Sequence, residues 1–392
     1  MAGEPQPEKG SDPGNRSKPK TPEQKKEGNA ESLIKTWGAI VLLFGVLYLF
    51  LVSIGMMGGS FKLLGKAFAE QLVSTTSNPI VGLFVGILAT TLVQSSSTTT
   101  SLVVGIVAAG SLTIESAVPI IMGANIGTTV TNTLVSMGHI TRRTEFRRAL
   151  AGATVHDFFN LIAVSILLPL ELMFGYLKNV AGFISTLFVG VGGMQLANPL
   201  KAVVTPAVKL GMGLLQDNAI AVLLVSLILM YLSLKFLVDL ARGLVVKRAE
   251  RFLHKYMFGS VPLAMLFGVI LTFLVQSSSI TTSLVIPLLG AGILTIQQIF
   301  PFTMGANIGT TVTAMLAALS TANVPAITIA FVHLLFNISG IALIFPIPQI
   351  RNIPIRMAEF LANFTSRSRG LAIVYMVSVF YVIPFLVILI WR

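Results

Sequence analysis

The chain has 392 residues, of which 54% are hydrophobic and only 11% are charged. A soluble domain carries about 25% charged residues, so this composition excludes one and indicates an integral membrane protein. The formal net charge of +12 comes from short basic clusters between apolar segments, a pattern typical of the positive-inside rule and not of nucleic-acid binding. Cysteine is absent, which excludes disulfide and thiolate chemistry.

Residues 1–36 differ from the rest of the chain. They hold seven Lys or Arg, six Asp or Glu and five Pro, and almost no large apolar residue precedes Leu33. Such a segment cannot bury enough apolar surface to offset its conformational entropy, so we predict a disordered tail. The mixed charge and the late apolar run do not fit a cleavable signal peptide. The run that follows is predicted to be a retained membrane helix.

Nine apolar stretches follow the tail, and a span requires about 20 apolar residues. Two of the stretches, 79–110 and 262–292, are interrupted in the middle by Gln-Ser-Ser-Ser. We predict that each is a re-entrant hairpin of two half-helices, because such backbone is tolerated only inside protein or beside a water-filled cavity. The predicted full spans are residues 37–55, 112–137, 149–173, 219–242, 294–319, 324–345 and 371–391.

Two further segments are weaker candidates for membrane spans. Residues 181–198 are apolar but rich in glycine, and residues 351–364 are amphipathic with spaced arginines. We predict that both lie at the membrane interface or pack against the helix bundle.

Charge sets the predicted orientation. The basic clusters of the tail and of residues 142–148, 242–255 and 351–369 all belong in the cytoplasm if each hairpin returns to the side from which it entered. The first hairpin then enters from outside and the second from inside. The predicted organisation is a cytoplasmic N-terminal tail and two halves in a multi-pass plasma-membrane protein. The halves are residues 37–178 and 218–392, joined by an extracellular linker, residues 179–217.

An internal repeat supports this organisation. Residues 94–131 recur at 276–313 without gaps, and 25 of the 38 positions are identical. A shorter match links VHDFFN at 155–160 with VHLLFN at 332–337. A duplicated polar break in a membrane protein indicates a central substrate site. The predicted fold is therefore an all-α polytopic membrane protein with two inverted repeats, each with a re-entrant helical hairpin and broken helices.

The hairpin tips carry the first candidate site. Serine is a preferred N-cap, so the second half-helix is predicted to begin there and to present unpaired N–H groups and a partial positive charge. Hydroxyls beside that helix start can donate to an oxyanion. Packing of small residues between helices is the alternative, and the matched serines of both repeats favour a site. The candidate anion-binding residues are Ser95, Ser96, Ser97, Ser277, Ser278 and Ser279.

The second candidate site is the segment Gly-Ala-Asn-Ile-Gly-Thr-Thr-Val-Thr at 123–131 and 305–313. Glycines within a span permit unwinding, and unwound carbonyls with Asn and Thr oxygens form a hard-cation shell. Close helix packing through glycines is the alternative. The candidate sodium ligands come from these two segments, from the tip glutamines and from the polar residues of 149–173. They are Gln94, Gln276, Asn125, Thr128, Thr129, Asn307, Thr310, Thr313, Asp157 and Asn160.

Asp157 is a functional candidate because an ionisable residue inside a membrane is costly. Leu334 occupies the equivalent position of the second repeat, so the halves are not chemically equivalent there. His156 and His333 fit hydrogen bonding within the bundle better than a proton relay. Asn160 and Asn337 fit cation ligation and interhelical hydrogen bonding equally well.

Together, the paired QSSS tips, both GANIGTTVT segments and TEFRRALAGATVHDFFN at 144–160 resemble the type II sodium/phosphate cotransporter family. The resemblance covers most of residues 79–346. It implies sodium-coupled symport of inorganic phosphate, with phosphate held between the tips, sodium as the coupling ion and no cofactor. In that family an Asp at the position of Asp157 accompanies electrogenic transport. The compact, cysteine-free chain looks like a bacterial member of an inner membrane.

The chain departs from the animal relatives in two places. They have a large outer loop with cysteines between the halves, and they carry a Gln and an Asp just before TEFRR, where this chain has His139 and Arg142. These differences concern one sodium site and the transport stoichiometry.

The same residues argue against four other functions. A carrier for another anion, such as a carboxylate or sulfate, usually calls for an Arg in its site, and every Arg here lies in a predicted loop or tail. A passive anion channel needs no cation ligands. A hydrolase needs a nucleophile beside a base, and the serines are far in sequence from His156. A scaffold needs no matched polar breaks.

Overall fold

The computed structural model describes residues 22–256 and 260–391, and within these ranges every regular element is a helix. The chain divides into two compact units, Met1–Leu42 and Leu43–Arg392. Helices α2 to α17 all belong to the second unit. Helix α1 (Pro22–Thr76) includes one residue with non-helical backbone, Gly65, whose φ is 81°.

The tail prediction is corrected from Pro22 onward. Its first 21 residues lie outside the described part, whereas residues 22–36 belong to α1 and are helical. These positions are rich in Glu and Lys, which are good helix formers. The polar composition that predicts disorder is therefore also compatible with a helix.

The two repeats give corresponding helices, except that α3 of the first repeat corresponds to α11 and α12 of the second, and α4 and α5 of the first correspond to α13. In the first repeat they are α2 (Pro79–Val93), α3 (Ser96–Ala108), α4 (Ile114–Gly127), α5 (Val130–Met137) and α6 (Arg143–Phe174). In the second repeat they are α10 (Val261–Val275), α11 (Ser278–Ser283), α12 (Ile286–Gly290), α13 (Ile296–Thr321) and α14 (Val324–Ile344). The predicted break at each Gln-Ser-Ser-Ser is confirmed, since α2 and α10 both end directly before the glutamine.

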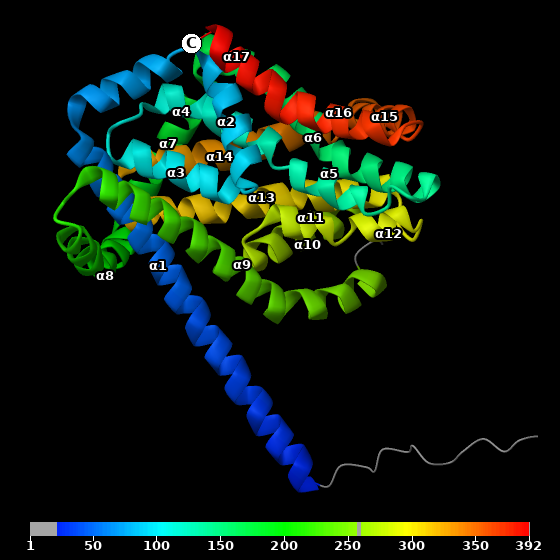
Figure 1. The fold of residues 1–392 in the computed structure, drawn as a ribbon, viewed down its shortest axis with the longest axis horizontal. Coiled ribbons are helices and arrows are strands. Elements are labelled where there is room, and N and C mark those ends of the chain that lie inside the picture. The colour runs from blue at the N-terminus through cyan, green and yellow to red at the C-terminus, as the bar shows by residue number, and fades with distance from the viewer. Residues whose placement is uncertain (1–21, 257–259, 392) are drawn as a thin grey trace, which may run out of the picture. The chain divides into compact units, whose positions relative to one another are not determined.

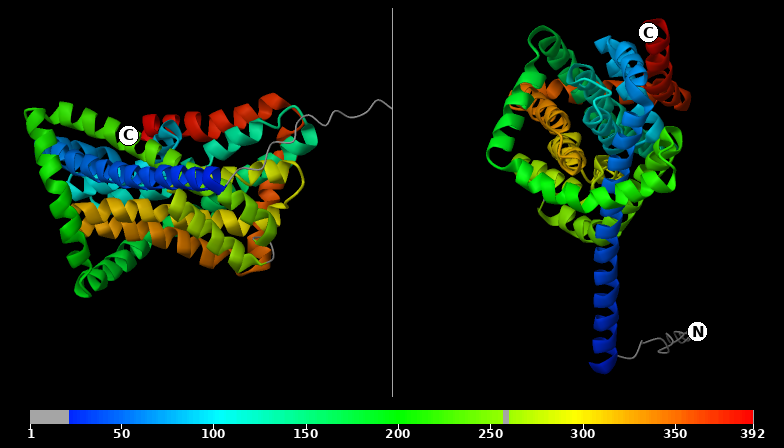
Figure 2. Two further views of the ribbon diagram at one scale, coloured as in Figure 1. Left: turned by 90° about the horizontal axis from the view of Figure 1, so that it is seen from below. Right: turned by 90° about the vertical axis from the view of Figure 1, so that its left-hand side faces the viewer.

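The remaining helices connect and flank the repeats. Three lie between them in sequence: α7 (Tyr176–Gly190), α8 (Gly193–Leu214) and α9 (Ala219–Tyr256). The C-terminal part consists of α15 (Pro348–Thr365), α16 (Arg369–Val377), the π-helical turn η1 (Ser378–Val382) and α17 (Ile383–Trp391). Figures 1 and 2 show α9 running along the outside of the helices of the second repeat.

Six helical segments of the described residues are long and apolar enough to cross a membrane. They are Trp37–Thr76, Arg143–Phe174, Ala219–Leu240, Ile296–Thr321, Val324–Ile344 and Gly370–Trp391. Each corresponds to a predicted span. The seventh predicted span, 112–137, is not a continuous helix, because it divides into α4 and α5 at Thr128 and Thr129, within the segment where unwinding is predicted. The hydroxyl of Thr128 donates to the carbonyl of Ala124 and that of Thr129 to the carbonyl of Ile126, and such bonds compete with the helical ladder.

The corresponding break in the second repeat lies elsewhere. Residues 305–313 have the same nine-residue sequence as 123–131, yet they form part of the continuous helix α13. The second repeat breaks between α11 and α12, near Pro287, where the first repeat has Gly105 within the continuous helix α3. Proline lacks the N–H that a helix interior uses, which explains this break. The two halves are therefore similar in sequence but differ in where a helix is interrupted.

Close backbone contact joins each leading half-helix to the span that follows it. Helix α2 packs along α4, and α10 packs along α13. A Cβ atom added to Gly123 would lie 1.9 Å from the carbonyl oxygen of Leu83, and one added to Gly305 would lie 1.9 Å from that of Met265. These glycines therefore serve close packing, the alternative weighed for them above.

The two weak segments pack onto the bundle. Residues 181–198 divide between α7, which packs against α14, and α8. Residues 351–364 lie in α15, which packs along α6 (Figure 1). None of these three helices is among the six spanning candidates of the described residues.

The predicted inversion can be tested by labelling. The native chain has no cysteine, so a single cysteine can be introduced at exposed Thr144, in the first turn of α6, or at exposed Val324, at the start of α14. We expect an impermeant maleimide to label Thr144→Cys only from the cytoplasmic face and Val324→Cys only from outside. Labelling of both from one face contradicts the inverted arrangement.

Candidate functional site

The two tips, residues 94–97 and 276–279, have the same local geometry. Gln94 and Gln276 both adopt left-handed backbone conformation with φ of 58°, which ends α2 and α10. The side chain of Ser95 then accepts a hydrogen bond from the N–H of Thr98, and that of Ser277 accepts one from the N–H of Ile280. The prediction that serine begins each second half-helix is confirmed.

A cavity of about 220 Å³ lies where the two tips meet. Its wall includes Gln94, Ser95 and Ser97 of the first tip and Gln276, Ser277 and Ser279 of the second. The other two candidate serines, Ser96 and Ser278, are buried and are not part of this wall. The structure therefore brings four of the six candidate serines to one cavity.

Direct contacts connect the tips across the repeats. The hydroxyl of Ser97 donates to the carbonyl of Gln276 at 3.4 Å, and the hydroxyl of Ser279 donates to the carbonyl of Thr128 at 3.4 Å. Both distances are at the long end for hydroxyl donors, which prefer about 2.7–2.8 Å. These two hydroxyls can therefore exchange a weak internal bond for a stronger one to an anion.

Each tip glutamine is fixed by a threonine of its own repeat. The hydroxyl of Thr131 donates to Oε1 of Gln94 at 3.0 Å, and the hydroxyl of Thr313 donates to Oε1 of Gln276 at 2.7 Å. The prediction placed Thr313 with the sodium ligands and left out Thr131, although both occupy the same position in the repeat. Because the threonine donates, the glutamine oxygen keeps a second lone pair that can accept another hydrogen bond or bind a cation.

A buried amide cluster joins the repeats deeper in the bundle. Asn307 donates to Oδ1 of Asn337 at 2.8 Å, and Asn160 donates to the carbonyl of Asn125 at 2.9 Å. Asn307 also reaches Oδ1 of Asn160 at 3.4 Å, and a ring nitrogen of His333 lies 3.4 Å from Oδ1 of Asn125. Interhelical hydrogen bonding is therefore observed for Asn160 and Asn337.

The remaining sodium candidates differ in their surroundings. The hydroxyls of Thr128, Thr129 and Thr310 donate to carbonyls three or four residues earlier in the chain, which leaves their lone pairs as acceptors. The carboxyl of Asp157 is buried, and its Oδ2 accepts a hydrogen bond from the Tyr375 hydroxyl at 3.2 Å. Its Oδ1 has no hydrogen-bond partner among the described residues. A buried carboxylate oxygen without a partner is costly, and a cation is one group that can satisfy it.

Sequence reasoning missed the contribution of α9. Exposed Tyr231, Lys235 and Asp239 of this helix form part of the cavity wall beside the tips. Lys235 and Asp239 both fall within a predicted span, and a charged residue there is a functional candidate by default. That rule identified Asp157 and could have identified these two residues. A second missed contact pairs Asn132 with Thr282, whose side chains lie 2.8 Å apart.

No cluster of three or more His, Asp or Glu side chains that could hold a metal ion occurs in the described ranges. The polar groups around the tips are hydroxyls, amides and carbonyls, together with the charged side chains of Lys235 and Asp239 on α9. This arrangement suits a small anion and a hard monovalent cation as transported ions.

The fold and the site define a polytopic α-helical membrane protein with two sequence-related halves and a polar cavity between their helix breaks. The family model described as Na+/Pi-cotransporter matches residues 49–197 and 218–363, which is more than half of the chain. The chain therefore belongs to the Na+/Pi-cotransporter family, whose members are transporters and not enzymes.

Among curated relatives, the chain is 36% identical to sodium-dependent phosphate transport protein 2A of Rattus norvegicus over 426 residues, covering 89% of this chain and 67% of that protein. It is 35% identical to sodium-dependent phosphate transport protein 2B of Homo sapiens over 444 residues, covering 88% of this chain and 64% of that protein. The chain thus spans about two thirds of the length of these relatives. No solved structure matches it.

Proposed function

We propose that this protein is a sodium-coupled symporter of inorganic phosphate that works by alternating access. Its proposed location is the plasma membrane of a bacterium, that is, the inner membrane, and its N-terminus is proposed to lie in the cytoplasm. Membership of the Na+/Pi-cotransporter family supports the transport class, and the names of the relatives support sodium and phosphate as the transported ions. The observation that carries the proposal is the cavity between the two tips, whose wall takes matched serines from both repeats.

Phosphate is proposed to bind between the tips. The starts of α3 and α11 are capped by Ser95 and Ser277, so each offers partial positive charge and unpaired N–H groups at the cavity. Ser97 and Ser279 add hydroxyl donors, and Lys235 adds a full positive charge at the exposed side of the wall. No Arg side chain is part of this wall, which fits a small oxyanion held by dipoles and hydroxyls.

Sodium is proposed to bind near the same tips. Candidate ligands are the Gln94 and Gln276 oxygens, each oriented by a threonine, and the threonine and asparagine oxygens of the two GANIGTTVT segments. Asp157 is proposed as a further ligand because its Oδ1 is buried without a partner in the described chain. Oxygen-only ligands suit sodium and provide no proton relay.

Alternating access is supported by the unequal helix breaks. The first repeat is interrupted between α4 and α5, and the second between α11 and α12, whereas the duplicated counterpart of each break lies in a continuous helix of the other repeat. Inverted repeats that adopt different conformations can exchange them, and the exchange opens the central site to the other side of the membrane. The breaks at Thr128 and near Pro287 are the proposed flexible points of this exchange.

Uptake of radiolabelled phosphate into proteoliposomes tests the proposed coupling. With an inward sodium gradient we expect accumulation, because binding of phosphate and sodium at adjacent sites makes each depend on the other. Replacement of sodium by potassium, or a proton gradient alone, is expected to abolish accumulation. Equal uptake in choline buffer rejects sodium coupling, and rapid equilibration without accumulation indicates a passive channel instead.

Asp157 provides a test of charge coupling. In Asp157→Gly the carboxylate is lost, so we expect the charge moved per phosphate to change while the protein still folds and reaches the membrane. One elementary charge that crosses the full potential is worth roughly 2.3 kcal/mol per 100 mV, so the voltage dependence of uptake is a sensitive measure. Tyr375→Phe is the matched control, because it removes the hydrogen bond at Oδ2 but keeps the carboxylate. Unchanged voltage dependence in a well-expressed Asp157→Gly protein assigns Asp157 to structure.

A further inference from the structure

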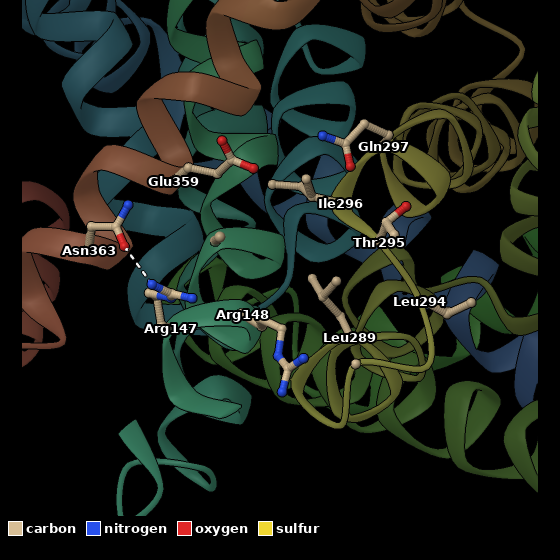
Figure 3. Close-up of a pocket in the computed structure, with 11 residues that line it drawn as sticks. Arg147, Arg148, Leu289, Leu294, Thr295, Ile296, Gln297, Glu359 and Asn363 are labelled. Atoms are coloured by element: carbon tan, nitrogen blue, oxygen red, sulfur yellow. Dashed lines mark hydrogen bonds between the residues drawn. The ribbon is translucent and has the colours of Figure 1, made fainter. Parts of the chain in front are cut away.

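A second cavity, separate from the tips, lies where α6, α15 and the segment between α12 and α13 meet. Its volume is about 420 Å³, which falls within the range of about 300–1,000 Å³ usual for ligand pockets. Figure 3 shows Arg147 and Arg148 extending into this region from the first turns of α6, with Thr295 and Gln297 on the opposite side and Glu359 and Asn363 on α15.

The two arginines are incompletely satisfied. Arg147 donates to Oδ1 of Asn363 at 3.3 Å and forms no ion pair with a described residue. Arg148 forms no hydrogen bond or ion pair with a described residue, and its Nε is buried without a partner. A Cβ atom added to Gly292 would lie 2.3 Å from Nη1 of Arg148, so only glycine lets the guanidinium lie so close to this backbone. A buried donor of a charged group without an acceptor is costly, and an anion satisfies it.

The surroundings add further positive potential. The cavity reaches the N-terminus of α13, a helix of 26 residues that begins after its cap, Thr295. A neighbouring hollow shares Arg147 and Asn363 and adds Arg143 and Arg367. Two guanidinium groups in the cavity, two more beside it and a helix N-terminus all favour a negative charge.

The rest of the wall narrows the ligand class. Leu289, Leu294 and Ile296 give the cavity an apolar side, which a bare inorganic anion would not use. Exposed Glu359 is an acceptor and can receive a hydrogen bond from a ligand hydroxyl, but it repels a second negative charge. A single phosphate group attached to a hydroxyl-bearing organic part fits this wall. The phosphate supplies the negative charge for the arginines, the organic part contacts the apolar side, and the hydroxyl donates to Glu359.

We propose that this cavity is a second anion site, which binds the phosphate group of a phosphoglycerol compound through Arg147 and Arg148. The ligand contacts α6 of the first repeat, the α12–α13 segment of the second repeat and α15, so its binding stabilises the observed arrangement of these three elements. The site is distinct from the cavity at the tips, with which it shares no wall residue. The same chemistry is found in a phosphatidylglycerol headgroup and in free glycerol phosphate.

Thermal unfolding of the purified full-length protein in sodium-free choline buffer tests this site. The probes are dioctanoyl phosphatidylglycerol, sn-glycerol 3-phosphate and, as the phosphate-free control, dioctanoyl glycerol. We expect a phosphoglycerol probe to raise the melting temperature of the native protein, and Arg147→Gln and Arg148→Gln each to weaken its apparent affinity by about 10-fold or more. Arg356→Gln is the matched control, because this exposed arginine of α15 lies outside the cavity wall, and it is expected to bind as the native protein does.

The outcomes separate the possible sources. A shift with the lipid alone identifies a headgroup site, and a shift with the free ester as well identifies a site open to soluble esters. A native-like response in both Arg147→Gln and Arg148→Gln overturns the proposal, as does an equal loss in Arg356→Gln or an equal shift with dioctanoyl glycerol. Should Arg148→Gln not fold, Arg147→Gln decides the test, because Arg147 is exposed and its replacement leaves no buried donor.

Discussion

Ser97→Ala and Ser279→Ala are each expected to raise the phosphate concentration that gives half-maximal uptake by about 10- to 150-fold at a fixed sodium concentration. Each variant removes a hydroxyl donor from the cavity between the tips, and a hydrogen bond to a charged group is worth roughly 1.5–3 kcal/mol. Both hydroxyls are buried and held only by contacts of 3.4 Å, so their loss costs the unliganded protein little. Radiolabelled uptake at varied phosphate concentration measures the change.

The position of the serines provides the controls. Ser96→Ala and Ser278→Ala alter buried serines outside the cavity wall, and Ser283→Ala removes a hydroxyl that donates to the carbonyl of Ile280 within its own half-helix. All three are expected to affect phosphate affinity less. The double variant of Ser97 and Ser279 should be non-additive, because both residues contact one ligand. Native-like affinity in both single variants places the phosphate site elsewhere.

Gly123→Ala and Gly305→Ala are expected to destabilise the protein strongly. In each case the new Cβ would lie 1.9 Å from a carbonyl oxygen of the packed half-helix, so α2 must move from α4, or α10 from α13. Overpacking of a well-packed interior costs typically 1–3 kcal/mol, and backbone contact leaves no flexible side chain to yield. The expected result is a clearly lower melting temperature in detergent and reduced recovery of monodisperse protein on size-exclusion chromatography.

Gly182→Ala is the matched control for these variants. Gly182 lies within α7, and no heavy atom outside its own helix lies within 4 Å of a Cβ added there. Alanine is favoured over glycine in a helix by up to about 1 kcal/mol, so this variant is expected to be neutral or slightly stabilising. A melting temperature of Gly123→Ala equal to that of Gly182→Ala contradicts the close packing of α2 on α4.

Features set by local chemistry were predictable from the sequence. The duplicated Gln-Ser-Ser-Ser segments predict helix breaks because serine caps a helix, and both breaks occur where expected. Six of the seven predicted spans correspond to long apolar helices, because membrane thickness fixes the required length. Membership of the family was likewise indicated by the two repeats and the segment at 144–160, and the family model confirms it.

Features that depend on distant neighbours were decided only by the tertiary structure. The nine residues at 123–131 and 305–313 are identical, yet the first copy is interrupted and the second is helical, so their own sequence cannot determine the difference. Which tip serines line the cavity, and whether Lys235 lines it, depends on which faces of α3, α11 and α9 meet there. The role of Gly123 and Gly305 depends on a carbonyl about forty residues earlier in the chain. Glycine permits both helix unwinding and close helix packing, and only the packed neighbour shows which of these two roles applies.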